Sequence, residues 1–184
     1  MKRLALSLCL LLLVGCSPAL TATPLNISPI ETLTATPTSA PAPNSGSCAY
    51  MWASQNLTDL TLDLQEAIKN IQPEAQANAF AFGEDCIYED GHKTFLAKET
   101  DFNVTLPVAD LTNESDLGDW IVKTMQVIGD LPAEKIVGPQ PGRVTMIFTT
   151  ATDQKFVNFY IDKYQALEPG LSGAEIFQAL QAQQ

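Results

Sequence analysis

Six acidic residues surround a cysteine between positions 84 and 101, so this stretch is the first candidate for chemistry. They are Glu84, Asp85, Glu89, Asp90, Glu99 and Asp101. Carboxylates that converge can bind a hard cation such as Ca²⁺. The spacing matches no EF-hand or similar loop. The first four are therefore candidate metal ligands, and a solvated acidic rim is the alternative that the spacing favours.

The other candidates for catalysis have structural explanations. His92, the one histidine, follows the turn sequence Glu89-Asp90-Gly91, which predicts an exposed hairpin tip. The sequence GLSGA at 170–174 distantly resembles a nucleophile elbow, but Ser172 and Glu175 have the spacing of a helix capping box. The sequence contains no phosphate-binding glycine loop, metal-ligand pattern, catalytic triad or cofactor motif. We therefore expect neither a catalytic residue nor a cofactor.

The N-terminus joins a short basic segment to an apolar one. Lys2 and Arg3 precede residues 4–14, which are apolar apart from Ser7 and Cys9. An apolar run of about eleven residues is too short to span a hydrocarbon core about 30 Å thick. The pattern predicts a secretory signal peptide over residues 1–15.

The end of this segment, Leu13-Val14-Gly15-Cys16, resembles the lipobox of bacterial prolipoproteins. The resemblance covers the first 16 residues. It implies that the Cys16 thiol receives a diacylglycerol group and that the signal peptide is cut before it. Two or more acyl chains give stable anchoring, so the resemblance implies a lipid anchor on the extracytoplasmic face of the cell membrane or the outer membrane. The alternative is an ordinary signal peptide that ends near Ala19.

Residues 16–47 have the composition of a tether. They are rich in Thr, Pro, Ala and Ser, and the sequence TATP occurs at 21–24 and again at 34–37. The prolines exclude a helix or a central strand, and there is no hydrophobic period. We expect a disordered linker that holds a globular domain, residues 48–184, away from the membrane.

The lipoprotein resemblance also limits the cysteine chemistry. Cys9 would leave with the signal peptide and Cys16 would be acylated, which leaves Cys48 and Cys86. Two remaining cysteines in a domain outside the cytoplasm predict one disulfide. A reactive thiol pair and metal ligands are the alternatives. We place Cys86 in a loop after the first strand. Tyr50 and Trp52, which flank Cys48, are interpreted as core anchors, or as a recognition patch if they are exposed.

Hydrophobic spacing predicts three helices and four strands in the domain. The helices cover residues 57–71, 116–128 and the segment from 172 onward. Their predicted N-caps are Asn56, Ser115 and Ser172. The strands cover residues 77–83, 94–108, 143–150 and 155–164. The order α-β-β-α-β-β-α predicts an α+β fold, a four-stranded antiparallel sheet with helices packed on one face.

The charge balance excludes one class of partner. The formal net charge is −11, and it is more negative without the basic signal peptide. Such a surface repels phosphate backbones, so we expect no nucleic-acid partner.

Two functions remain open. The first is a non-enzymatic, membrane-anchored module that binds an envelope protein, a glycan or a small ligand, with the open sheet face as its binding surface. The alternative is an envelope enzyme, or an accessory subunit of one, with an acidic site near residues 84–101. A deep pocket where Glu84, Asp85 and His92 converge would favour the enzyme. A flat apolar patch would favour the binding module.

Overall fold

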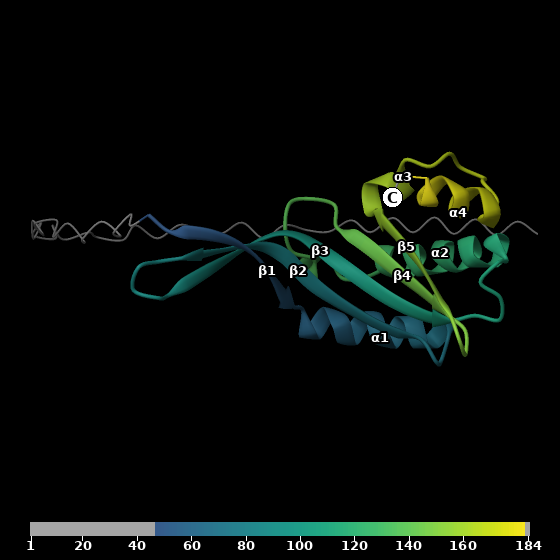
Figure 1. The fold of residues 1–184 in the computed structure, drawn as a ribbon, viewed down its shortest axis with the longest axis horizontal. Helices are drawn as coiled ribbons and strands as arrows, with labels where there is room; N and C mark the ends of the chain where they lie inside the picture. Colours follow the sequence, from purple (N-terminus) through teal and green to yellow (C-terminus); the bar gives the residue numbers. More distant parts are fainter. Residues whose placement is uncertain (1–46, 183–184) are drawn as a thin grey trace, which may run out of the picture. The chain divides into compact units, whose positions relative to one another are not determined.

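The computed structural model describes residues 47–182 (Figure 1). The predicted lipidation site Cys16, the signal peptide and nearly all of the predicted tether lie outside these residues. The strands are β1 (Ala49–Asn56), β2 (Gln76–Ile87), β3 (Lys93–Pro107), β4 (Arg143–Thr149) and β5 (Gln154–Tyr160). The helices are α1 (Thr58–Ile71), α2 (Glu114–Gly129), α3 (Ile161–Gln165) and α4 (Gly173–Gln181), with a 3-10 turn, η1 (Ala133–Lys135).

The strands form one mixed sheet in the order β1-β2-β3-β4-β5. The α+β class is confirmed, but the prediction of four antiparallel strands is wrong in two respects. β1 is a fifth strand that precedes the first helix, and its sequence AYMWASQN lacks an apolar–polar alternation because most of its side chains are exposed. β3 and β4 are parallel, whereas the other neighbours are antiparallel. The helix α2 supplies the crossover that a parallel pair needs.

All the long helices pack on one face of this sheet. Ala79, Phe102, Val144 and Phe159 are neighbours across four strands, so their side chains lie on the same face. These residues belong to a single core cluster that also contains Leu64 and other inward side chains of α1, α2 and α4. The opposite face of the sheet carries no helix in the described part of the chain.

The ends of the elements differ in places from the predictions. Asn56 is the last residue of β1 and not a helix cap, because α1 follows the strand almost directly. The N-cap of α2 is Asn113, whose side chain accepts a hydrogen bond from Asp116 N, and Ser115 lies inside the helix. The last strand ends at Tyr160, where the chain turns into α3. The capping box of Ser172 and Glu175 is confirmed.

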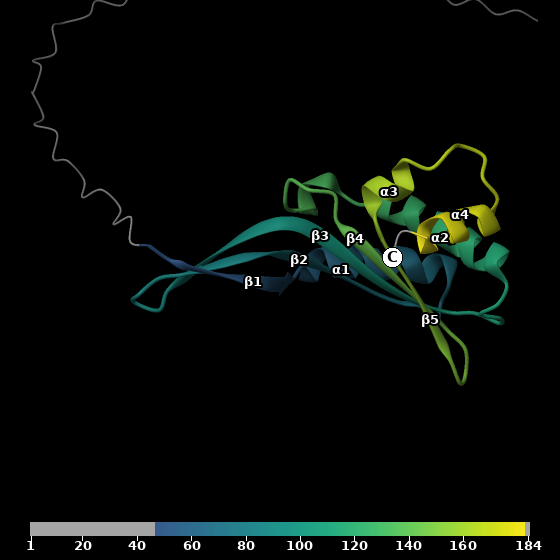
Figure 2. The same ribbon diagram turned by 45° about the horizontal axis from the view of Figure 1, so that its top comes forward.

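One part of the sheet extends beyond the helices. The core cluster reaches Ala79 on β2 and Phe102 on β3. Past these positions β2 and β3 continue as a hairpin, and β1 pairs with it over residues 80–87 of β2 (Figures 1 and 2). We call this three-stranded extension, residues 49–54 and 82–98, the ribbon. A β-bulge between Phe82 and Gly83 marks its start, where Lys98 is the extra residue of β3.

Candidate functional site

The exposed strand β1 is the most unusual feature of the ribbon. It forms one edge of the sheet and contains neither a charged residue nor a proline. Tyr50 is 74% exposed and Trp52 is 63% exposed, so the interpretation of these residues as core anchors is wrong. The physical reason is that β1 lies outside the area covered by the helices. Natural edge strands usually carry charges, prolines or bulges that prevent pairing with another chain.

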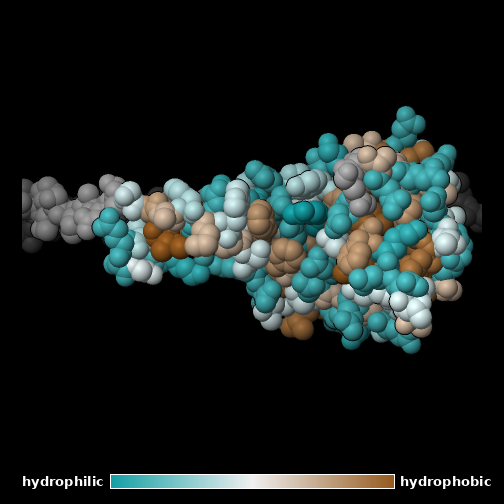
Figure 3. Space-filling view, in the orientation of Figure 1, coloured by the Kyte–Doolittle hydropathy of each residue, from teal (hydrophilic) through white to brown (hydrophobic). Residues whose placement is uncertain are grey.

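The aromatic side chains of β1 share one face with neighbours on the hairpin. Trp52 pairs with Glu84, and Glu84 pairs with Leu96, so these three residues form a row across the ribbon. The Trp52 ring also stacks on Phe82, with 5.3 Å between the ring centroids and 11° between the planes. Tyr50, Trp52, Phe82 and Leu96 make an apolar patch on this face, and Glu84 lies between Trp52 and Leu96 in the row. Figure 3 shows that hydrophobic and hydrophilic residues both lie at the surface of the ribbon. We call Tyr50, Trp52, Phe82 and Leu96 the aromatic patch.

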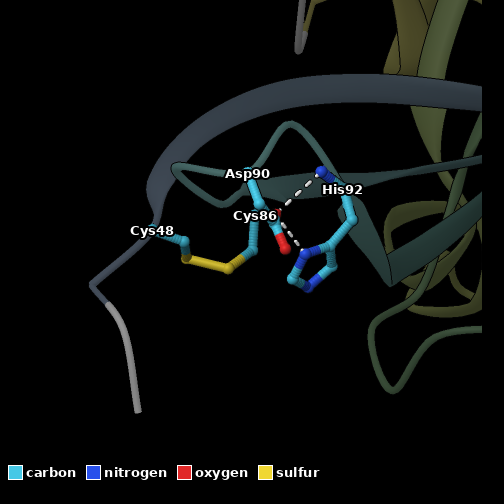
Figure 4. Close-up of polar contacts among 4 residues, drawn as sticks. All are labelled: Cys48, Cys86, Asp90 and His92. Atoms are coloured by element: carbon cyan, nitrogen blue, oxygen red, sulfur yellow. Dashed lines mark hydrogen bonds and ion pairs between the residues drawn. A yellow bond between two sulfur atoms is a disulfide. The ribbon is translucent and has the colours of Figure 1, made fainter. Parts of the chain in front are cut away.

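A disulfide between Cys48 and Cys86 closes the ribbon, and its Cα–Cα distance is 5.4 Å (Figure 4). The predicted pairing is confirmed. The placement of Cys86 in a loop is wrong, because this residue lies in β2 opposite Tyr50. The bond joins the residue before β1 to the strand beside it. It therefore fixes the start of the edge strand at the point where the chain enters the domain.

The predicted acidic residues do not gather into one site. Glu84 and Asp85 are consecutive in β2, so their side chains point to opposite faces. Glu84 lies 3.4 Å from Lys98 Nζ, and Asp85 Oδ2 accepts a hydrogen bond of 2.8 Å from Lys93. Across residues 47–182, no three or more His, Cys, Asp or Glu side chains form a group that could hold a metal ion.

His92 and Asp90 belong to the turn between β2 and β3. The His92 backbone donates to Asp90, and the His92 ring contacts the same carboxylate (Figure 4). These hydrogen bonds, that of the backbone first, hold the pKa of Asp90 below its ordinary value. The imidazole also stacks on Tyr88, with 4.0 Å between the centroids. The exposed hairpin tip is confirmed, and both residues stabilise the turn.

A buried carboxylate pair lies at the junction between the ribbon and the covered part of the sheet. Glu99 is 6% exposed and Asp101 is 4% exposed, although both point to the face without helices. The pKa of Glu99 is raised, mainly by burial and then by the charge of Asp101, and Arg143 opposes this rise. Sequence reasoning placed these two residues only near the acidic rim, because their two-residue spacing in a strand is also typical of a solvated face.

Residues 138–142 run beside the backbone of β3 next to this pair. Gln140 N donates to the Lys98 carbonyl at 3.0 Å and Arg143 N donates to Asp101 Oδ1 at 2.7 Å. The loop passes so close to β3 that a Cβ on Gly142 would lie 1.7 Å from the Thr100 carbonyl oxygen. Asp101 thus accepts a hydrogen bond from the first residue of β4, and this contact has a structural role because it joins β4 to β3.

The comparisons with known proteins give no relative from which a function could be inferred. The chain matches no family model, and neither the curated proteins nor the solved structures include a significant match. Among the helices of the described region, none has the length and apolar character needed to cross a bilayer.

Proposed function

We propose that this chain is a lipid-anchored extracytoplasmic binding protein, and that the edge strand β1 with its aromatic patch binds a segment of a partner protein in the cell envelope. The observation that carries this proposal is the exposure of Tyr50 and Trp52 on an uncharged, unprotected edge strand. A flat apolar patch is the feature expected of a binding module.

An edge strand offers a partner two kinds of contact. Its outer backbone groups can pair with an extended segment, which provides affinity through main-chain hydrogen bonds. Its side chains provide specificity, and exposed Tyr and Trp are enriched in the energetically dominant parts of interfaces. In a chain with a formal net charge of −11, the neutral strand β1 is a surface that another protein can approach without charge repulsion at the contact itself.

The disulfide supports the same interpretation. Without it, β1 would be held by its ladder with β2 and by the stack of Trp52 on Phe82, since the strand makes little contact with the core. The Cys48–Cys86 bond keeps the edge strand in place while its side chains stay exposed. A strand ordered before binding loses less conformational entropy when a partner pairs with it.

Site-specific photocrosslinking in the native envelope tests the binding surface. A benzophenone amino acid replaces Tyr50 in one variant and Leu62, an exposed apolar residue of α1, in a matched control. We expect discrete protein adducts from position 50 that disappear when Trp52→Ser is added, and none from position 62. Equal adducts from both positions, or none from position 50, would contradict the proposal.

The lipid anchor has its own test. Mass spectrometry of the protein from native membranes should show an N-terminal Cys16 that carries diacylglycerol. Cys16→Ser should release the protein from the membrane fraction or leave its signal peptide uncut. An N-terminus at another residue, or no added acyl mass, would refute this part of the proposal without affecting the binding surface.

A further inference from the structure

A cavity of about 920 Å³ lies at the opposite edge of the sheet from β1, beside the edge strand β5 and the helix α3. It is lined by Arg143, Asn158, Phe159, Tyr160, Lys163, Ala166 and Leu167. Its volume is in the range of about 300 to 1,000 Å³ that small-molecule sites usually have. The lining combines two cationic residues with two aromatic residues and aliphatic side chains, although the chain as a whole is strongly acidic.

Arg143 lines this cavity, and two neighbouring side chains lie close to its guanidinium. Its guanidinium lies 5.7 Å from the centre of the Tyr160 ring, a cation–π distance. Its Nη2 atom lies 4.0 Å from Asp101 Oδ2, which is at the limit of an ion pair. The guanidinium has five N–H donors in a planar fork. The contact with Asp101 orients the group and leaves donors for a ligand.

Lys163 is unusual among the basic residues between positions 47 and 182. Four of them pair with carboxylates, namely Lys93, Lys98, Lys135 and Arg143. Lys123 and Lys155 lie over aromatic rings. Within the same range, only Lys69 and Lys163 have neither kind of partner. Lys163 is the one of these two that lines a cavity, where it adds a second positive charge near Arg143.

We propose that this cavity binds a small organic anion, with one acidic oxygen group and an apolar body. The acidic group would bind Arg143 and Lys163, because a guanidinium and an ammonium both favour anionic oxygens. The apolar body would contact Tyr160, Ala166 and Leu167. Asn158 Oδ1 already accepts a hydrogen bond from Thr145, so its side-chain NH₂ remains to donate to a polar substituent. This proposal does not depend on the function proposed for β1.

Fluorescence titration with 8-anilinonaphthalene-1-sulfonate, an aromatic anion, tests this site on the purified full chain. We expect saturable binding that weakens about three- to tenfold in Lys163→Gln, the loss typical of one hydrogen bond. Lys69→Gln removes the same charge from α1 and should leave the affinity unchanged. The neutral analogue N-phenyl-1-naphthylamine should bind both variants and the parent chain alike. Equal affinities of the sulfonate for Lys163→Gln and the parent would overturn the proposal.

Two further measurements locate the probe and identify the ligand chemistry. Trp52→Ser should not change the affinity for the sulfonate; a loss there would place the probe on the aromatic patch and overturn the inference. Octanoate should displace the bound sulfonate, whereas octanol at the same concentration should not. Displacement by both to the same extent would show that the cavity selects only apolar bodies, which would also contradict the proposal. Arg143 is left unchanged in these tests because its backbone and side chain both contact Asp101.

Discussion

The strands β2 and β3 each pass through two environments, and the two halves are stabilised in different ways. Under the helices, Ala77, Ala79, Phe102 and Val104 alternate with polar residues and are buried in the core. In the ribbon, the same strands have neither helix nor core above them, and Leu96 is exposed. The covered half is stabilised by apolar burial. The ribbon depends on its hydrogen-bond ladder, one disulfide, two ion pairs and the stack of Trp52 on Phe82.

This difference separates stability from binding. The inward side chains of the covered half pack in the core, so a substitution there changes the stability of the whole domain. Tyr50 and Trp52 contribute little to a core, so selection for folding alone does not explain large aromatic residues at these positions. The ribbon is therefore the part of the sheet where a mutation at the proposed binding surface should leave the fold intact.

Replacement of a large side chain in each half gives the largest contrast. Phe148→Ala, at a fully buried position of β4, should lower the free energy of unfolding by about 3 to 5 kcal/mol, because it leaves a cavity in the core. Trp52→Ala removes an even larger side chain from the ribbon and should cost about 1 kcal/mol or less, chiefly the lost stacking on Phe82. Urea denaturation measures both. Similar losses for the two variants would show that the ribbon is part of the core.

Removal of the disulfide tests whether the ribbon needs its covalent link. The bond joins residues separated by 38 positions, and the double variant Cys48→Ser/Cys86→Ser should lose about 2 to 4 kcal/mol, as is typical of native disulfides. Hydrogen exchange should quicken first in β1 and in the hairpin, because these segments have the least burial. Uniform acceleration that includes β4 and β5 would argue against a separately stabilised ribbon.

The same comparison explains what could be predicted from the sequence. The covered half follows the two-residue and helical periods that burial imposes, so the core positions of β4 and the capping box at Ser172 were predictable. β1 has no buried side chain, and the strand therefore gives no periodic signal. The Cys48–Cys86 pair was predicted from cysteine counting and compartment, which do not depend on periodicity.

The parts of the site that were missed depend on long-range contacts. Arg143 reaches the cavity because β4 returns beside β3, and that parallel pairing was not predicted. Lys163 was expected in a strand, but it lies in α3, whose turn away from the sheet forms the cavity wall. The hydrogen bonds of Asp101 and of the β3 backbone beside Glu99 likewise come from a segment about forty residues further along the chain. Local sequence patterns do not predict such long-range contacts.

A buried hydroxyl without a hydrogen-bond partner lies within the covered half, and its removal should raise the stability of the domain. Thr124, in α2, is fully buried and its hydroxyl has no hydrogen-bond partner. Thr124→Val keeps the branched shape and removes the unpaired hydroxyl, so the free energy of unfolding should rise by about 1 to 2 kcal/mol. Thermal unfolding measures the change. A loss of stability would mean that the hydroxyl has a polar partner, such as a buried water molecule.

The smallest effect is expected at the junction of the two halves, where Glu99 lies. Its pKa is raised in the folded state above the ordinary value of 4.5, because of burial and the nearby charge of Asp101. The folded protein then holds this proton more tightly than the unfolded chain does. Glu99 therefore favours folding below about pH 4.5, and this contribution is lost as the pH rises through the raised pKa.

Glu99→Gln should remove that dependence and stabilise the protein at pH 7 by about 1 kcal/mol, because an amide can donate to Asp101 where a second carboxylate repels it. Glu66→Gln, on the exposed face of α1, removes the same charge from an acidic protein and provides the matched control. Chemical denaturation from pH 4 to 8 should show a slope that differs from the parent's for Glu99→Gln and the parent's slope for Glu66→Gln. If both variants changed stability equally, the effect would come from net charge alone, and the buried carboxylate pair would not be a distinct feature of the junction.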